Sequence, residues 1–160
     1  MLKKLMVPFL LCSAFAGVSA HANASSISGA SVASAKVVST KSIYWSCGVA
    51  TSSSKGFRGD MHGTVKTFSD GRKDVHISRV NIHKHGGQGG GNKANFEAHM
   101  TGWNGSATFA SRYSGDNMKQ DGSNNNVNMS MAAYNSNSLR FKFTFDKSGN
   151  DPKCTSNIAI

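Results

Sequence analysis

Residues 127–145 read VNMSMAAYNSNSLRFKFTF, and this stretch decides the fold class. Hydrophobic side chains occupy alternate positions on both sides of the polar segment Asn135-Ser136-Asn137, which is typical of a turn. A period of two places the apolar side chains on one face of a strand and the polar ones on the other. One buried face and one wet face are the pattern of an antiparallel sheet. The stretch therefore predicts two half-buried β-strands.

The same alternation recurs upstream. It appears in residues 43–49, 96–100 and 107–113, and it slips by one position within 75–83. A β-bulge near Ser78-Arg79 would repair that slip by inserting one residue. Asp70-Gly71 and Asn104-Gly105 are hairpin-turn signals, and no helical period survives beyond the N-terminus. The sequence predicts an all-β fold, a single antiparallel β-sandwich or barrel of about seven strands with hairpin connections.

The first 22 residues have the features of a signal peptide. Lys3 and Lys4 precede an apolar run over 5–18, and small residues before Ala20 and Ala22 offer two cleavage sites. The run is too short to span a membrane, which needs about 20 residues. We therefore expect an exported protein, periplasmic or secreted, with no transmembrane segment after cleavage. The Ser/Ala-rich residues 23–35 are expected to form a flexible arm, and 36–160 a single β domain.

The cysteines point to one disulfide. Cys12 lies in the predicted signal peptide, which leaves Cys47 and Cys154, 107 residues apart. Two cysteines in an oxidising compartment most simply pair. Closing a loop of this length stabilises the fold by about 4–5 kcal/mol in the chain-entropy model.

The chain is strongly basic. It has 18 Lys and Arg against 8 Asp and Glu, and loss of Lys3 and Lys4 leaves 16 basic residues and a net charge of +8. Such a charge favours anionic partners: nucleic acid, anionic lipid or acidic polysaccharide. Arg140 and Lys142 alternate with the phenylalanines, and Lys66, His76 and Arg79 are expected on a wet face. The candidate binding residues are Lys66, Arg79, Trp103, Arg140 and Lys142. Trp103 is included because an aromatic beside a turn can stack on bases or sugar rings.

Catalytic patterns are sparse. Glu97 is the single glutamate, so the facing carboxylate pair of a glycosidase cannot be nominated. No serine lies in Gly-x-Ser-x-Gly. A metal-free nuclease needs only histidine with Lys or Arg. His76 with Arg79 or Lys73, or His99 with Glu97 on one strand face, could transfer a proton near a phosphate. No catalytic residue is assigned, and an enzyme is the less favoured interpretation.

Histidines offer an alternative metal site. His83 and His85 are two residues apart and would share a strand face, where they could bind copper or zinc with a third ligand from His62, His76 or His99. His21 would also be a copper ligand if cleavage after Ala20 made it the N-terminus. No cofactor is otherwise expected.

These observations favour a binding protein. The expected partner is an anionic envelope or extracellular polymer, or another protein, with nucleic acid also open. The alternatives are a histidine-based metal protein or secreted nuclease-like enzyme, and a secreted toxin or antimicrobial that uses its basic surface. The oligomeric state does not follow from the sequence.

Overall fold

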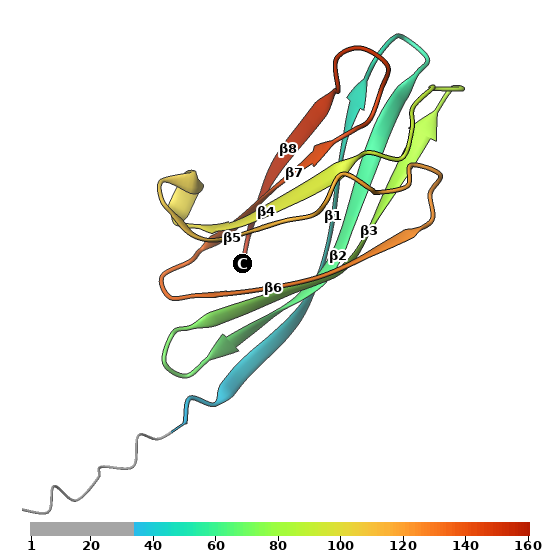
Figure 1. Ribbon diagram of the computed structural model, residues 1–160. Coiled ribbons are helices and arrows are strands. Elements are labelled where there is room, and N and C mark those ends of the chain that lie inside the picture. The colour runs from blue at the N-terminus through green and yellow to red at the C-terminus, as the bar shows by residue number, and fades with distance from the viewer. Residues whose placement is uncertain (1–33) are drawn as a thin grey trace, which may run out of the picture. The chain divides into compact units, whose positions relative to one another are not determined.

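The computed structural model describes residues 34–160. The predicted signal peptide, His21 and most of the predicted arm lie outside the described residues. The described part is built almost entirely of β-strands (Figure 1). The elements are β1 (Val37–Ala50), β2 (Gly56–Phe68), β3 (Lys73–His85), β4 (Asn95–Thr101), the short 3-10 helix η1 (Trp103–Gly105), β5 (Thr108–Tyr113), β6 (Asn124–Ala133), β7 (Ser138–Thr144) and β8 (Lys153–Ala159).

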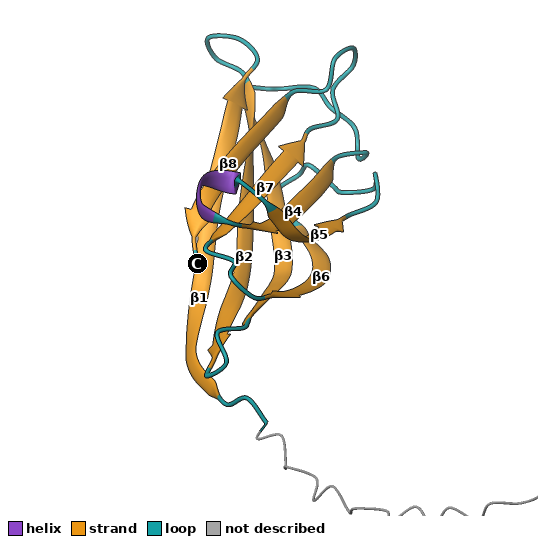
Figure 2. Ribbon diagram, turned by 90° about the vertical axis from the view of Figure 1, so that its left-hand side faces the viewer, coloured by secondary structure: helices purple, strands orange, loops and turns teal. Residues whose placement is uncertain are grey.

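Two four-stranded sheets form the fold. The first sheet has the order β1-β2-β3-β6, the second has the order β5-β4-β7-β8, and every neighbouring pair is antiparallel. The two sheets face each other (Figure 2). This confirms the predicted all-β fold and fixes it as a sandwich. Hairpins join β1 to β2, β2 to β3, β4 to β5 and β7 to β8, whereas the other connections pass between the sheets.

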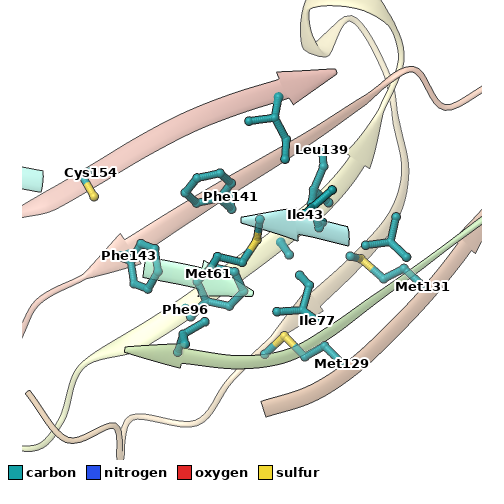
Figure 3. Packing of buried hydrophobic residues seen from close by; sticks show 14 of the residues in the cluster. Ile43, Met61, Ile77, Phe96, Met129, Met131, Leu139, Phe141, Phe143 and Cys154 are labelled. Carbon is teal, nitrogen blue, oxygen red and sulfur yellow. The ribbon is translucent and has the colours of Figure 1, made fainter. Parts of the chain in front are cut away.

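The core lies between the sheets and is made by the alternating residues predicted to be apolar. Phe141 and Phe143 from β7 meet Met61 and Ile77 from the first sheet (Figure 3), and all four side chains are fully buried. Gly59 lies under the Phe143 ring, since a Cβ atom added there would be 2.6 Å from ring carbons. The close approach of strand and ring therefore requires glycine at this position.

The slip within 75–83 is a β-bulge at Ser78. His62 pairs with Arg79 and Gly63 pairs with Ile77, so Ser78 is the inserted residue. Ile77 and Val80 are both fully buried on either side of it. The bulge keeps the two phases of the strand on the same core, as its hydrophobic pattern predicted.

The structure has one strand more than the roughly seven expected. Residues 153–159, expected to be a tail after the last strand, form β8 and pair with β7 along its whole length. Their hydrophobic signal is weak because only Cys154 and Ile158 are buried in it. The backbone ladder to β7 therefore positions this segment more than its side chains do.

The two sides of the sandwich differ. On one side the edge strands β1 and β8 are joined by the disulfide Cys47–Cys154 and by a hydrogen bond from Trp45 Nε1 to Ser156 Oγ at 2.8 Å. The disulfide confirms the pairing predicted from the sequence. On the other side the edge strands β5 and β6 belong to different sheets and have no ladder between them. Residues 34–160 contain no helix that is long and apolar enough to cross a membrane.

Candidate functional site

The outer face of the first sheet gathers most of the chemically versatile side chains. The strand pairing sets Tyr44 opposite His62, and His62 opposite Arg79, all pointing away from the core. The term first-sheet face is used below for the outward residues of β1, β2 and β3, which are Tyr44, Arg58, Asp60, His62, Lys66, His76, Arg79 and His83. They come from separate strands and meet through cross-strand register, not through sequence proximity.

Asp60 organises one end of this face. It is 7% exposed, accepts a hydrogen bond from Arg58 Nε at 2.8 Å, and lies 3.3 Å from His83 Nε2 through its other oxygen. Arg58 also donates to the Tyr44 hydroxyl at 2.8 Å. A buried carboxylate needs such partners. Asp60 therefore neutralises Arg58 and orients His83, leaving little negative charge accessible to a ligand.

The middle of the face is positively charged. Within residues 34–160 neither Lys66 nor Arg79 has a carboxylate within ion-pairing distance, and both side chains are exposed. His62 is half-buried, and its pKa lies below the ordinary value of 6.5, first because desolvation opposes the charged ring and second because Arg79 repels it. The second carboxylate of this face, Asp74, lies opposite Lys66 in the β2–β3 register, but it pairs with Arg72 at 3.1 Å. Lys66 and Arg79 are therefore open cations.

Shallow hollows mark the same area. One, of about 310 Å³, lies against Tyr44, His62, Thr64 and His76. A second, of about 390 Å³, continues past Thr64 and His76 to Lys66. Because the two share Thr64 and His76, they form a continuous depression across the strands.

The outer face of the second sheet carries a smaller cluster. Lys142 Nζ pairs with Glu97 at 2.6 Å, and His99 lies 3.6 Å from the other oxygen of Glu97. His99 Nδ1 also lies 2.8 Å from Ser111 Oγ. Arg140 is the cross-strand partner of His99 in the β4–β7 ladder. The predicted pair of Glu97 and His99 therefore exists, but Lys142 neutralises the carboxylate.

The five candidate binding residues occupy three separate places. Lys66 and Arg79 lie on the first-sheet face, and Arg140 and Lys142 lie on the outer face of the opposite sheet. Trp103 is in η1 and 66% exposed, as expected for an aromatic beside the Asn104-Gly105 turn. Since Lys142 is paired with Glu97, Lys66 and Arg79 are the stronger candidates.

Two expectations about aromatic residues fail. The alternation of residues 43–49 predicts that Trp45 lies in the core, but Trp45 is 46% exposed because β1 is an edge strand and the indole reaches across to β8. Phe109 and Tyr113, read as part of the pattern of residues 107–113, are also exposed. They belong to β5, the edge strand of the second sheet, which has a neighbour on one side only.

The histidines do not form a metal cluster in the described residues. His83 and His85 are neighbours on one face, with ring centroids 6.5 Å apart, but His83 is turned to Asp60. Residues 34–160 hold no group of three His, Cys, Asp or Glu side chains placed to bind a metal ion. The proposal of a copper or zinc site at His83 and His85 therefore gains no third ligand here, and His21 lies outside the described residues.

Sequence reasoning missed Arg58 and Asp60. Residues 56–68 were not recognised as a strand because glycines and polar residues dilute their alternation. The available signal was the run Arg58, Asp60 and His62 at spacing two, which is typical of one wet strand face. Their joint role depends on Tyr44 and His83, which only the strand register brings near.

Comparison with known proteins adds little. No family model and no curated protein sequence matches this chain. Among solved structures it is similar to the Streptococcus agalactiae AgI/II polypeptide BspA variable (V) domain, with 14% identity, a TM-score of 0.33, and coverage of 93% of this chain and 92% of that one. This likeness is too distant to carry an argument about function. The argument therefore rests on the residues of this chain.

Proposed function

We propose that this chain is an exported binding domain that holds an anionic envelope or extracellular polymer on its first-sheet face. The observation that carries the proposal is the pair of open cations Lys66 and Arg79 beside a depression on a flat sheet surface. The charge of +8 left after removal of the predicted signal peptide supports it through long-range attraction. The disulfide is compatible with an oxidising, extracytoplasmic location.

The chemistry of the face suits phosphate or sulfate groups. Arg79 offers a planar fork of donors and Lys66 a mobile point charge. Tyr44, half exposed beside His62 at a ring distance of 4.9 Å, provides an aromatic surface next to them. Asp60 does not repel such a ligand, because Arg58 covers it.

Binding of long-chain polyphosphate, measured by calorimetric titration, tests this function, because this polyanion carries neither sugar hydroxyls nor carboxylates. The double variant Lys66→Gln/Arg79→Gln should bind about ten-fold more weakly, a change of roughly 1.4 kcal/mol. The matched control, Lys147→Gln/Lys153→Gln, removes the same charge near the β7–β8 turn and should retain most of the affinity. Affinity should fall as salt rises. Equal losses in both double variants would mean that net charge alone acts, and absence of binding at low salt would contradict the proposal.

A second candidate function follows from Asp60 and His83. A buried carboxylate that orients a half-exposed histidine beside arginine is an arrangement able to transfer a proton near a phosphate. This supports the nuclease-like alternative. Incubation with single-stranded RNA tests it: cleavage by the parent protein that disappears in both Asp60→Asn and His83→Gln would establish it, whereas no cleavage would exclude it for that substrate.

A further inference from the structure

The open side of the sandwich contains a hollow larger than either of those on the first-sheet face. It is a groove of about 620 Å³ between the two edge strands β5 and β6. The edge of β6 from Asn124 to Ser130 forms one wall, and the end of β5 with parts of the following loop, Arg112 to Gly115 and Asn117 to Lys119, forms the other. This edge groove is separate from the first-sheet depression, although both reach Ser130.

The loop wall of the groove is anchored from behind. Gln120 is fully buried, donates to the carbonyls of Gly91 and Asp146 at 2.9 and 2.8 Å, and accepts from the Asp146 amide at 3.1 Å. Asn125 exchanges two hydrogen bonds with the backbone of Lys119. The groove therefore has a fixed shape before any ligand arrives.

The exposed lining is rich in amides and carries no acid. Asn117, Asn126 and Asn128 line the groove, and none of them makes a hydrogen bond through its side chain within residues 34–160. Each primary amide offers two donors and an acceptor, which matches hydroxyl groups that both donate and accept. No Asp or Glu of the described residues lines the groove.

Asn128 is held in an unusual backbone conformation. Its φ is 44°, in the left-handed region that costs energy for a residue with a side chain. It lies in a bulge of β6: Ile77 pairs with Met129 and Arg79 with Asn126, so Val127 and Asn128 face the single residue Ser78. Such bulges redirect side chains, and they also break the regular edge that an added peptide strand would need. The groove therefore favours a ligand recognised by side chains.

Two cations complete the lining. Arg112 pairs with buried Ala98 across the β4–β5 ladder, which turns it toward the inner side of the second sheet and hence toward the groove. Within residues 34–160 its guanidinium makes one hydrogen bond, from Nη1 to the Ser111 carbonyl at 2.9 Å. Arg112 and exposed Lys119 therefore supply positive charge in a site that otherwise presents amides and hydroxyls. An arginine fork fits a carboxylate with two parallel hydrogen bonds.

We infer that the edge groove binds an acidic oligosaccharide, with Asn117, Asn126 and Asn128 bonding sugar hydroxyls and Arg112 bonding a uronate-type carboxylate. The groove adjoins the first-sheet face at Asn126, the cross-strand partner of Arg79, but its binding does not require Lys66 or Arg79. A polyanion without hydroxyl groups should bind the first-sheet face and leave the groove unoccupied.

Calorimetric titration of the exported protein with hexagalacturonate tests the inference. Its fully methyl-esterified form is the matched control, because it retains the rings and free hydroxyls but lacks the charge. Arg112→Gln should weaken binding of the acid about ten-fold and leave binding of the ester unchanged. Asn128→Gly keeps the left-handed backbone accessible and removes the amide, so it should weaken both sugars.

The same titration distinguishes the two sites. Lys66→Gln/Arg79→Gln, which should bind polyphosphate more weakly, is expected to bind hexagalacturonate like the parent protein. Unchanged affinity in both Arg112→Gln and Asn128→Gly, or no binding of hexagalacturonate by the parent protein, would overturn the inference without affecting the first-sheet proposal.

Discussion

Arg79 and His62 are cross-strand partners on the outer face of the first sheet. The guanidinium repels the charged imidazolium, and together with partial burial it keeps the pKa of His62 below 6.5. The pair has a direct consequence for ligand binding. An anion placed between the two side chains would reverse the repulsion, so His62 reports on whether this part of the face is occupied.

The pKa of His62 should therefore depend on Arg79. In Arg79→Gln it should rise, without reaching the full ordinary value, because desolvation is the larger cause of the shift. Bound polyphosphate should also raise it in the parent protein. NMR titration of the imidazole signals measures all three states. An identical pKa in the parent protein and the variant would contradict the assigned repulsion.

His62 should also make stability depend on pH in one direction. Its folded pKa lies below the unfolded value of about 6.5, so the unfolded chain takes up the proton more readily. The favourable contribution of His62 to the free energy of unfolding is complete above the pKa of the unfolded chain. It is lost as pH falls through the pKa of the folded protein. Urea unfolding between pH 7.5 and 4.5 should show a smaller decrease in stability for His62→Gln than for the parent protein.

Removal of the disulfide should weaken the fold strongly. Cys47 and Cys154 close a loop with a sequence separation of 107 residues. The chain-entropy model gives about 4–5 kcal/mol for such a loop. Cys47→Ala/Cys154→Ala should lose about that amount in urea unfolding, and dithiothreitol should have no further effect on this variant. A loss below about 1 kcal/mol would show that the β1–β8 edge is held by other contacts.

Gly59 should not tolerate a side chain. Gly59→Ala would place a methyl carbon 2.6 Å from carbons of the Phe143 ring. Overpacking of this kind costs about 1–3 kcal/mol. Gly89→Ala is the matched control, since nothing lies within 4 Å of its Cβ position. Thermal or urea unfolding compares the two. Equal stability of both variants would contradict the packing described.

Gln120 should hold two long loops together. Gln120→Leu keeps similar volume but leaves the Gly91 and Asp146 backbone groups unpaired, and three net hydrogen bonds amount to about 2–3 kcal/mol. Hydrogen exchange of the Asp146 amide should accelerate in this variant and stay unchanged in Lys119→Ala. Slow exchange in Gln120→Leu would show that the loops are ordered without this contact.

The fold was largely predictable and the site was not. Alternation in residues 127–145 reports burial on one face, so it predicts strands and core without knowledge of partners. The slip within residues 75–83 predicts the Ser78 bulge in the same way. The network of Tyr44, Arg58, Asp60 and His83 depends on register between three strands, which no single strand encodes. The strand β8 was not predicted for a related reason, since backbone pairing with β7, not a hydrophobic pattern, positions it.

The same distinction explains the scattered binding candidates. Arg140 and Arg79 both lie on wet strand faces, a property that the period of two reveals. Which sheet each strand joins is a matter of topology, and the structure places these arginines on opposite outer faces. Charge pattern alone therefore identified cations but not their grouping.

The central claim is that the first-sheet face is the surface that binds an anionic polymer. Backbone amide NMR spectra recorded during a titration with long-chain polyphosphate test it most directly. The account predicts that the largest shifts occur in β2 and β3 around Lys66, His62 and Arg79, and that Lys66→Gln/Arg79→Gln abolishes most of them. Shifts centred on Arg140 and Lys142 in β7, or none at low salt, would contradict it.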